Sequence, residues 1–166
     1  MTFSVSDFRT KLNGGARANL FEVLVTGAPV TLPNVNLLCK AAAVPGFTIG
    51  MIEVPFRGRR IKVPGDRTFA EWTVTFISDP TMRLRAGFED WMKAIKDTDY
   101  TSQNQGAATP YFSTVTVNHM NDQGSNSATY KLIDAFPTDI SQIDLSYDST
   151  DAIEEFTVTF QYHYLQ

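Results

Sequence analysis

Strict alternation between apolar and polar residues over positions 155–164 constrains the fold more than any other feature of this sequence. One face of an extended chain would carry large side chains, namely Phe156, Val158, Phe160, Tyr162 and Tyr164. The positions between them hold Glu, Thr, Thr, Gln and His. A period of two is typical of a β-strand with one buried and one wet face. The same alternation over 71–76, with Trp72, Val74 and Phe76 on one side, predicts a second such strand.

Four further segments favour strands because they are rich in β-branched or aromatic residues and end at Gly, Pro or Asn turns. They are residues 19–26, 35–43, 111–119 and 128–136. The last two would be joined by a turn over 121–126, and the polar stretch 97–110 predicts a loop.

A single amphipathic helix is predicted over 80–96, with Asp79 as its cap and Pro80 at the first helical position. Its apolar stripe, at steps of four, three and four, consists of Leu84, Phe88, Trp91 and Ile95. Near the N-terminus, residues 1–15 predict an arm with a short helix that Ser6 caps and Gly14-Gly15 ends.

Residues 46–67 predict a long hairpin or extended loop that leaves the body of the domain. Pro55 and Pro64 lack the N–H group that a central strand needs, and Gly58 can form the turn. We expect the segment 65–68 to form a second turn that returns the chain to the strand beginning near Trp72.

Together these elements predict one domain over residues 1–166, a mainly β, antiparallel sandwich or barrel with one flanking helix and a protruding hairpin. A hydrophobic content of 43 % supports a packed core. No secretory signal or membrane-spanning stretch is expected.

Charge is divided unevenly along the chain. Residues 1–96 hold 13 Lys/Arg and 8 Asp/Glu, whereas residues 97–166 hold one Lys and 10 Asp/Glu, which gives +5 and −9 and a net charge of −4. Such a chain could attract copies of itself head to tail, or the two halves could mix on one surface.

The sequence contains no recognisable pattern of catalytic residues. Cys39 lies in an apolar strand segment and is interpreted as a small buried hydrophobe, and His119 and His163 have no metal-ligand spacing. No phosphate-binding loop or nucleophile elbow is present. We therefore expect no enzyme activity, no metal and no cofactor.

Two charged clusters leave alternatives open. The late carboxylates could hide a glycosidase pair, although a solvated acidic surface is the simpler interpretation. They are Asp139, Asp144, Asp148, Asp151, Glu154 and Glu155. The basic run over 57–62 could bind phosphates, serve as a docking hairpin, or form a solvated loop.

The stretch from Arg59 to Trp72 reads R-x-I-x-V-x-G-D-R-T-F-x-x-W and closely resembles the tail tube proteins of contractile-tailed phages. The segments 19–23, 38–46 and 155–160 fit the same family. The resemblance covers most of the chain and is weakest over 98–126.

The resemblance implies a structural virion protein, assembled in the host bacterial cytoplasm. Hexameric rings would join their strands into one β-barrel and stack into the inner tube of the tail. Implied partners are the chain itself, the tail sheath protein, the tape measure protein, and the baseplate and tail terminator proteins. DNA would pass through the lumen without specific binding, and we expect that lumen to be neutral or acidic.

From the charge split we predict that the hairpin 53–66 docks on the next ring. Apolar anchors would add to weak ion pairs between basic residues and carboxylates of the neighbour. The residues assigned to this interface are Val54, Phe56, Arg57, Arg59, Arg60, Ile61, Lys62, Asp66, Asp139, Asp144, Asp148 and Asp151.

Other functions remain open at this point. The tube of a bacteriocin or of a type VI secretion system has the same implied architecture. A baseplate or carbohydrate-binding β-sandwich would instead stay a discrete oligomer, and a hydrolase would need turnover that depends on two late carboxylates.

Overall fold

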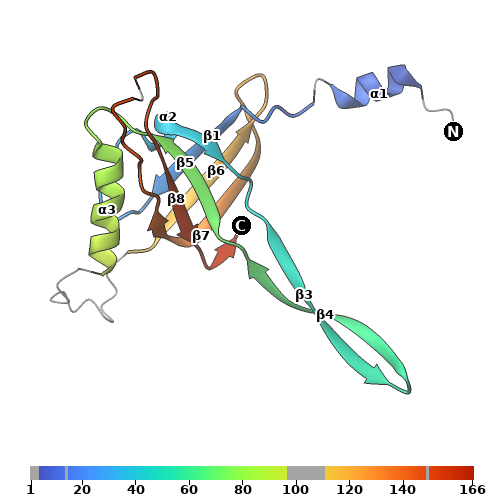
Figure 1. Cartoon of the computed structure of the whole chain (residues 1–166). Coiled ribbons are helices and arrows are strands. Elements are labelled where there is room, and N and C mark those ends of the chain that lie inside the picture. The colour runs from blue at the N-terminus through green and yellow to red at the C-terminus, as the bar shows by residue number, and fades with distance from the viewer. Residues whose placement is uncertain (1–3, 14, 97–110, 149) are drawn as a thin grey trace.

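The body of the protein is one curved antiparallel sheet closed by a helix. The computed structural model describes residues 4–13, 15–96, 111–148 and 150–166, so the loop predicted over 97–110 lies outside the described residues. The strand order is β1-β6-β7-β8-β5-β2, with β9 also paired to β7 (Figure 1). A separate two-stranded ribbon, β3-β4, extends away from this sheet. The predicted mainly β, antiparallel class is confirmed.

The strands of the sheet are β1 (Phe21–Thr26), β2 (Cys39–Ala42), β5 (Trp72–Ile77), β6 (Ser113–Met120), β7 (Asn126–Ile140), β8 (Glu155–Gln161) and β9 (Tyr164–Leu165). The ribbon is β3 (Phe47–Phe56) with β4 (Arg59–Phe69), and the helices are α1 (Val5–Leu12), α2 (Val35–Leu38) and α3 (Arg83–Ile95).

The long strand β7 makes the corner that curves the sheet. Its first part pairs with β6 and its last part, from Phe136 to Ile140, pairs with β8. Between them Asp134 has a φ of 55°, and the register shifts in both ladders. A left-handed residue and irregular registers bend a strand, so one segment serves both halves of the sheet.

Helix α3 packs its apolar stripe against the aromatic face of β5 and β8. Leu84, Phe88 and Trp91 are fully buried, and Ile95 packs at the edge of the core, as predicted. The Phe88 ring lies 5.3 Å from Phe76 and 6.0 Å from Phe160, measured between centroids. These contacts fix one end of the barrel-like body.

Two predicted boundaries of helices are wrong. Helix α3 begins at Arg83 rather than Pro80, because Met82 has a φ of 49° and interrupts the helical path. The residues before it form a turn in which the Asp79 carboxylate accepts a hydrogen bond from the Thr81 hydroxyl. Helix α1 is capped by Ser4, not Ser6, since the Ser4 hydroxyl accepts from the Ser6 N–H.

The strand predicted over 35–43 is only half correct. Asn34 has a φ of 56°, and its carbonyl accepts from the N–H groups of Leu37 and Leu38, both at 3.0 Å. This makes the single helical turn α2, which buries Val35, and β2 begins only at Cys39.

The C-terminal strand ends earlier than its alternation predicts. Phe156, Val158, Phe160 and Tyr162 are buried as expected, but Tyr164 is half exposed. Gln161 of β8 already pairs with β7, the His163 N–H donates to the Ile133 carbonyl, and the chain continues along β7 as β9. The break in the strand at residues 162–163 separates Tyr164 from the alternation of β8.

Candidate assembly surface

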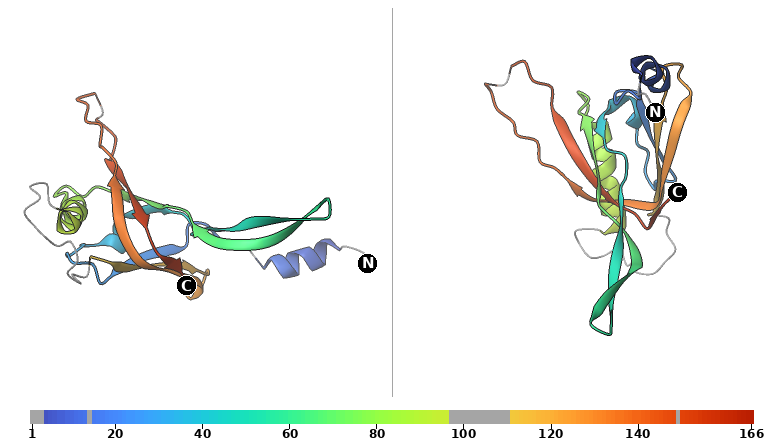
Figure 2. Two further views of the ribbon diagram at one scale, coloured as in Figure 1. Left: turned by 90° about the horizontal axis from the view of Figure 1, so that it is seen from below. Right: turned by 90° about the vertical axis from the view of Figure 1, so that its right-hand side faces the viewer.

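The β3-β4 ribbon is the largest feature that the body does not cover, and it extends as a narrow arm (Figures 1 and 2). Its strands are joined by two residues, Arg57 with a φ of 45° and Gly58 with a φ of 78°. Two left-handed residues make the tight turn that matches the twist of a hairpin. The predicted hairpin and its turn at Gly58 are therefore present.

The outer half of the ribbon has two chemically different faces. Directly opposed residues of an antiparallel pair lie on the same face, and successive residues alternate between faces. The pairs Ile52–Val63, Val54–Ile61 and Phe56–Arg59 share one face. The pairs Glu53–Lys62 and Pro55–Arg60 share the other.

The apolar face is exposed in the isolated chain. Phe56 is 58 % exposed and Ile52 is 55 % exposed. Val63 is the least exposed of the five apolar residues on this face, at 41 %; the other two are Val54 and Ile61. Monomeric proteins rarely leave such a contiguous apolar surface in water, so its burial by another molecule is expected. The predicted anchors Val54, Phe56 and Ile61 all lie on this face.

The basic residues of the ribbon differ in how far the chain already engages them. Arg60 forms an ion pair with Glu53 at 2.9 Å, and the guanidinium of Arg57 lies 5.5 Å from the centroid of the Phe56 ring. Arg59 stands on the apolar face, whereas Lys62 is on the charged one. The four cations therefore point in different directions around the tip of the ribbon.

A narrow waist separates the outer half of the ribbon from its base. Gly50 faces two residues of β4, Gly65 and Asp66, where the register shifts. A Cβ atom added to Gly65 would lie 3.2 Å from the Gly50 carbonyl oxygen. The predicted turn over 65–68 is thus wrong: the segment is a β-bulge inside a continuous strand, and Asp66 is an exposed residue of that bulge.

The predicted acidic partners fall into two groups. Asp139 is exposed on β7, opposite Thr159 of β8. Asp144, Asp148 and Asp151 are exposed in the segment 141–154, called the acidic loop, which connects β7 to β8. The ribbon and the acidic loop leave the body on different sides, the ribbon downward and the loop upward in Figure 1 and in the right panel of Figure 2. A basic and an acidic projection on different sides of the body suit head-to-tail contact.

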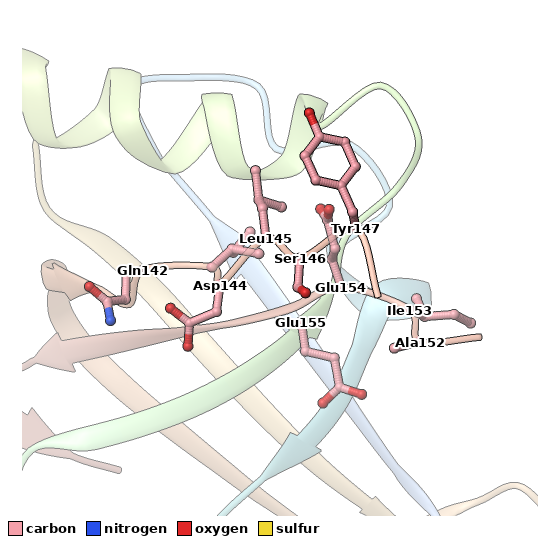
Figure 3. A pocket seen from close by; sticks show the side chains of 10 residues that line it. Gln142, Asp144, Leu145, Ser146, Tyr147, Ala152, Ile153, Glu154 and Glu155 are labelled. Atoms are coloured by element: carbon pink, nitrogen blue, oxygen red, sulfur yellow. The ribbon is translucent and has the colours of Figure 1, made fainter. Parts of the chain in front are cut away.

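The acidic loop encloses a hollow of about 560 Å³ between its outgoing and returning arms. Figure 3 shows Asp144, Leu145 and Tyr147 on one arm and Ile153 and Glu154 on the other. Three of its apolar members, Leu145, Tyr147 and Ile153, are strongly exposed, whereas Ile143 packs against the core. Mixed apolar and acidic lining favours a partner that is both apolar and basic.

The two end strands of the sheet each have an open edge within the described residues. β1 pairs only with β6, and β2 pairs only with β5. Unpaired backbone groups on such edges are templates for strands of another chain.

Three of the residues considered for chemistry have surroundings that the structure describes. Cys39 packs at the edge of the core, and burial raises its pKa to about 11, which suits a small hydrophobe. His163 Nδ1 lies 3.8 Å from Asp134, and the Glu155 carboxylate is paired with Lys40. Among the described residues, no cluster of three or more His, Cys, Asp or Glu could hold a metal, and no helix could cross a bilayer.

The sequence analysis missed the two faces of the ribbon. The signal is present: Ile52, Val54 and Phe56 alternate with Glu53 and Pro55 on either side of a two-residue turn. A hairpin that is predicted without a strand register leaves its two faces unassigned.

Curated relatives and solved structures agree with this architecture. The chain is 30 % identical to the tail tube protein gp19 of Enterobacteria phage T4 over 149 residues, 90 % of each chain. It is 28 % identical to the tail tube protein of Serratia phage KSP90, over 78 % of this chain and 72 % of the relative.

The fold is similar to a chain in the cryo-EM structure of the sheath-tube complex of PVC, an extracellular contractile injection system, with a TM-score of 0.64, 18 % identity and 99 % of both chains covered. A chain of the anti-feeding prophage tube-terminating cap matches with a TM-score of 0.66 and 18 % identity, covering 91 % and 89 % of the two chains. The family profile of phage tail tube proteins matches residues 5–165. The chain therefore belongs to the phage tail tube protein family.

Proposed function

We propose that copies of this chain assemble into the inner tube of a contractile phage tail, the conduit for DNA. Copies would join through sheet edges β1 and β2 into hexameric rings that form one barrel. Rings would then stack through the ribbon. The protein acts as a structural component of the virion, assembled in the host cytoplasm, and catalyses no reaction.

One observation carries this proposal: the ribbon exposes a complete apolar face that its own chain cannot cover. An isolated two-stranded hairpin is marginally stable in water. A hairpin of this length therefore needs a partner surface to hold it in one conformation. Head-to-tail contact between identical copies can supply that surface, and it repeats without closing.

In the proposed stacking contact, the tip of the ribbon meets the acidic loop of the next ring. The segment 57–62 carries four cations and no carboxylate, while the segment 144–151 carries three carboxylates and no cation. Each exposed ion pair contributes about 0–1 kcal/mol, so the apolar face supplies most of the contact energy.

Negative-stain microscopy of the concentrated pure protein tests the assembly. Rings or tubes with a central hole are expected. Discrete oligomers without a channel would contradict the proposal and favour a baseplate or sugar-binding module.

The stacking contact has its own test. Substituting Arg59 and Arg60 by Glu should leave the far-UV circular dichroism unchanged and stop tube growth. Adding Asp148→Lys and Asp151→Lys to the same chain should restore growth if opposite charges meet there. Long tubes from the first variant would refute the docking of the ribbon tip.

The wet face of β5 and β8 suits a channel for DNA. It carries Thr73, Thr75, Thr157 and Thr159 in direct cross-strand pairs. Threonine hydroxyls are neutral, so a lumen lined by this face would offer phosphates few fixed cations to bind.

The remaining partners follow from the assembly. The tail sheath protein would surround the tube, the tail terminator and baseplate proteins would meet its ends, and the tape measure protein would occupy the lumen before DNA. The PVC sheath-tube complex and the PVC sheath/tube terminator are similar structures that support the first two contacts.

A second candidate is the tube of a contractile injection system outside phages. Full coverage of both chains in the PVC comparison favours it, whereas the higher identity to the T4 and T6 tail tube proteins favours a phage tail. Immunogold microscopy of particles from the host, with antibodies against this chain, distinguishes them by whether the labelled particles carry a DNA-filled head.

A further inference from the structure

Helix α1 forms a second uncovered apolar surface that the ribbon contact does not use. Val5, Phe8 and Leu12 follow one another at steps of three and four, so they share one side of the helix. They are 77 %, 65 % and 50 % exposed, and α1 has no buried residue. Its last turn is basic, with Arg9 and Lys11.

Both ends of α1 are capped by residues of the same chain. Ser4 caps the start, and Asn13, with a φ of 41°, donates its N–H to the Arg9 carbonyl. Eight residues are nevertheless too few for a stable isolated helix in water, where about 12 to 15 are needed. A defined helix of this length with one apolar side therefore implies a surface that it packs on.

The body does not offer α1 such a surface in its own copy. The arm is held at its base, where Arg17 lies 3.5 Å from Asp122. Beyond that point α1 extends away from the sheet, in a direction that differs from those of the ribbon and of the acidic loop (Figures 1 and 2). Its partner surface is therefore sought on a second molecule.

The hollow of the acidic loop matches α1 in two independent properties. Three of the apolar residues that line it, Leu145, Tyr147 and Ile153, are 71 % or more exposed in their own chain. Its polar lining includes Asp144 and Glu154, against the cations of the last turn of α1. The tip carboxylates Asp148 and Asp151 do not line the hollow, so they stay accessible to the ribbon.

We propose that α1 of one copy inserts its apolar side into the acidic-loop hollow of a second copy of this chain, with Arg9 and Lys11 beside the carboxylates. This contact rests on the proposed tube, and it would use the base of the acidic loop, whereas the ribbon would meet the tip carboxylates of that loop. Helix α1 would be packed against a partner surface only within the assembly.

Cysteine cross-linking in assembled tubes tests the contact. A Cys39→Ala chain with Phe8→Cys is co-assembled with a Cys39→Ala chain with Ile153→Cys, and a mild oxidant is added. We expect disulfide-linked dimers. The matched control is Thr10→Cys, because residue 10 lies on the opposite side of α1 and should give at least about five-fold less product.

A charge exchange provides a second readout. Arg9→Glu should raise the critical concentration for tube formation about five-fold without changing the thermal unfolding of the subunit. Adding Glu154→Lys to that chain should recover most of the loss, because Glu154 lines the hollow and belongs to no other proposed contact.

The outcomes separate this contact from the tube itself. Tubes that form without the Phe8–Ile153 cross-link, or with equal cross-linking from position 10, would overturn the α1 contact and leave the tube proposal standing. Absence of tubes from the unaltered chain would overturn the tube proposal and this contact with it.

Discussion

The sheet body and the β3-β4 ribbon both carry regularly spaced apolar residues, but the body buries them and the ribbon exposes them. Phe88 in the body is completely buried by its own chain, whereas Phe56 in the ribbon is 58 % exposed. Both belong to regular apolar patterns, one at helical and one at strand spacing. Periodicity therefore tells which residues will be covered, and only the fold tells whether the cover comes from the same chain or from a neighbour.

The largest expected effect comes from removing matched phenylalanines from the two regions. Phe88→Ala should lower the free energy of unfolding by about 3–5 kcal/mol, because it empties a site between Phe76, Trp91 and Phe160. Phe56→Ala should change it by less than about 0.5 kcal/mol and yet impair tube growth. Urea unfolding of the subunit and light scattering of the polymer measure the two effects.

The result that would break the comparison is a similar destabilisation from both substitutions. The ribbon would then be part of the cooperative core rather than a surface reserved for another copy.

A smaller effect is expected at Gly87, within the body. Gly→Ala inside a helix usually adds about 1 kcal/mol of stability. Here the new Cβ would lie 2.9 Å from Leu32 Cδ2 and 3.2 Å from the Thr31 carbonyl oxygen, so we expect a loss of about 1–3 kcal/mol instead. Thermal unfolding tests the sign, and Ala94→Gly in the exposed part of α3 provides the control for helix propensity. A gain in stability would show that the loop before α2 yields easily.

The faces of the strands and of α3 were predictable because burial within one chain imposes a period. Val158 and Phe160 on β8, and Leu84 and Trp91 on α3, are buried as their spacing requires. The hairpin was predictable for a related reason, since Pro55, Gly58 and Pro64 are chemically unsuited to a central strand.

The irregular positions were not predictable because they depend on contacts far along the chain. Met82 and Asn34 adopt left-handed conformations that move the starts of α3 and α2, although neither is a glycine. Asp134 bends β7 where it changes partner from β6 to β8. For the assembly surface, the residues could be named from the sequence, but their division between an apolar and a charged face required the register of β3 with β4.

A still smaller change in stability is expected at the waist of the ribbon. Gly65→Ala places a methyl group against the Gly50 backbone, so the two strands must separate by a few tenths of an ångström. Gly46→Ala is the matched control, since its Cβ would meet nothing within 4 Å. We expect Gly65→Ala alone to raise the critical concentration for tubes about three-fold, with a change in body stability below about 0.5 kcal/mol. Equal behaviour of the two variants would mean that the waist does not aim the ribbon.

The smallest effect on stability is expected at Cys39, where the body meets β2. Burial disfavours the thiolate and raises the pKa of Cys39 from 9.0 to about 11. Because the unfolded chain ionises first, the stability contributed by this thiol is complete below about pH 9 and is lost as the pH rises towards 11. At neutral pH, stability should therefore be unaffected and only the reactivity of the thiol should differ.

Alkylation of Cys39 by iodoacetamide at pH 8 should be at least about a hundred-fold slower than alkylation of the thiol in a Val54→Cys variant, which lies on the apolar face of the ribbon. Equal rates in the unassembled subunit would show that the edge of the body at β2 is as accessible to water as the ribbon. The contrast between a buried body and an exposed ribbon would then not hold at β2.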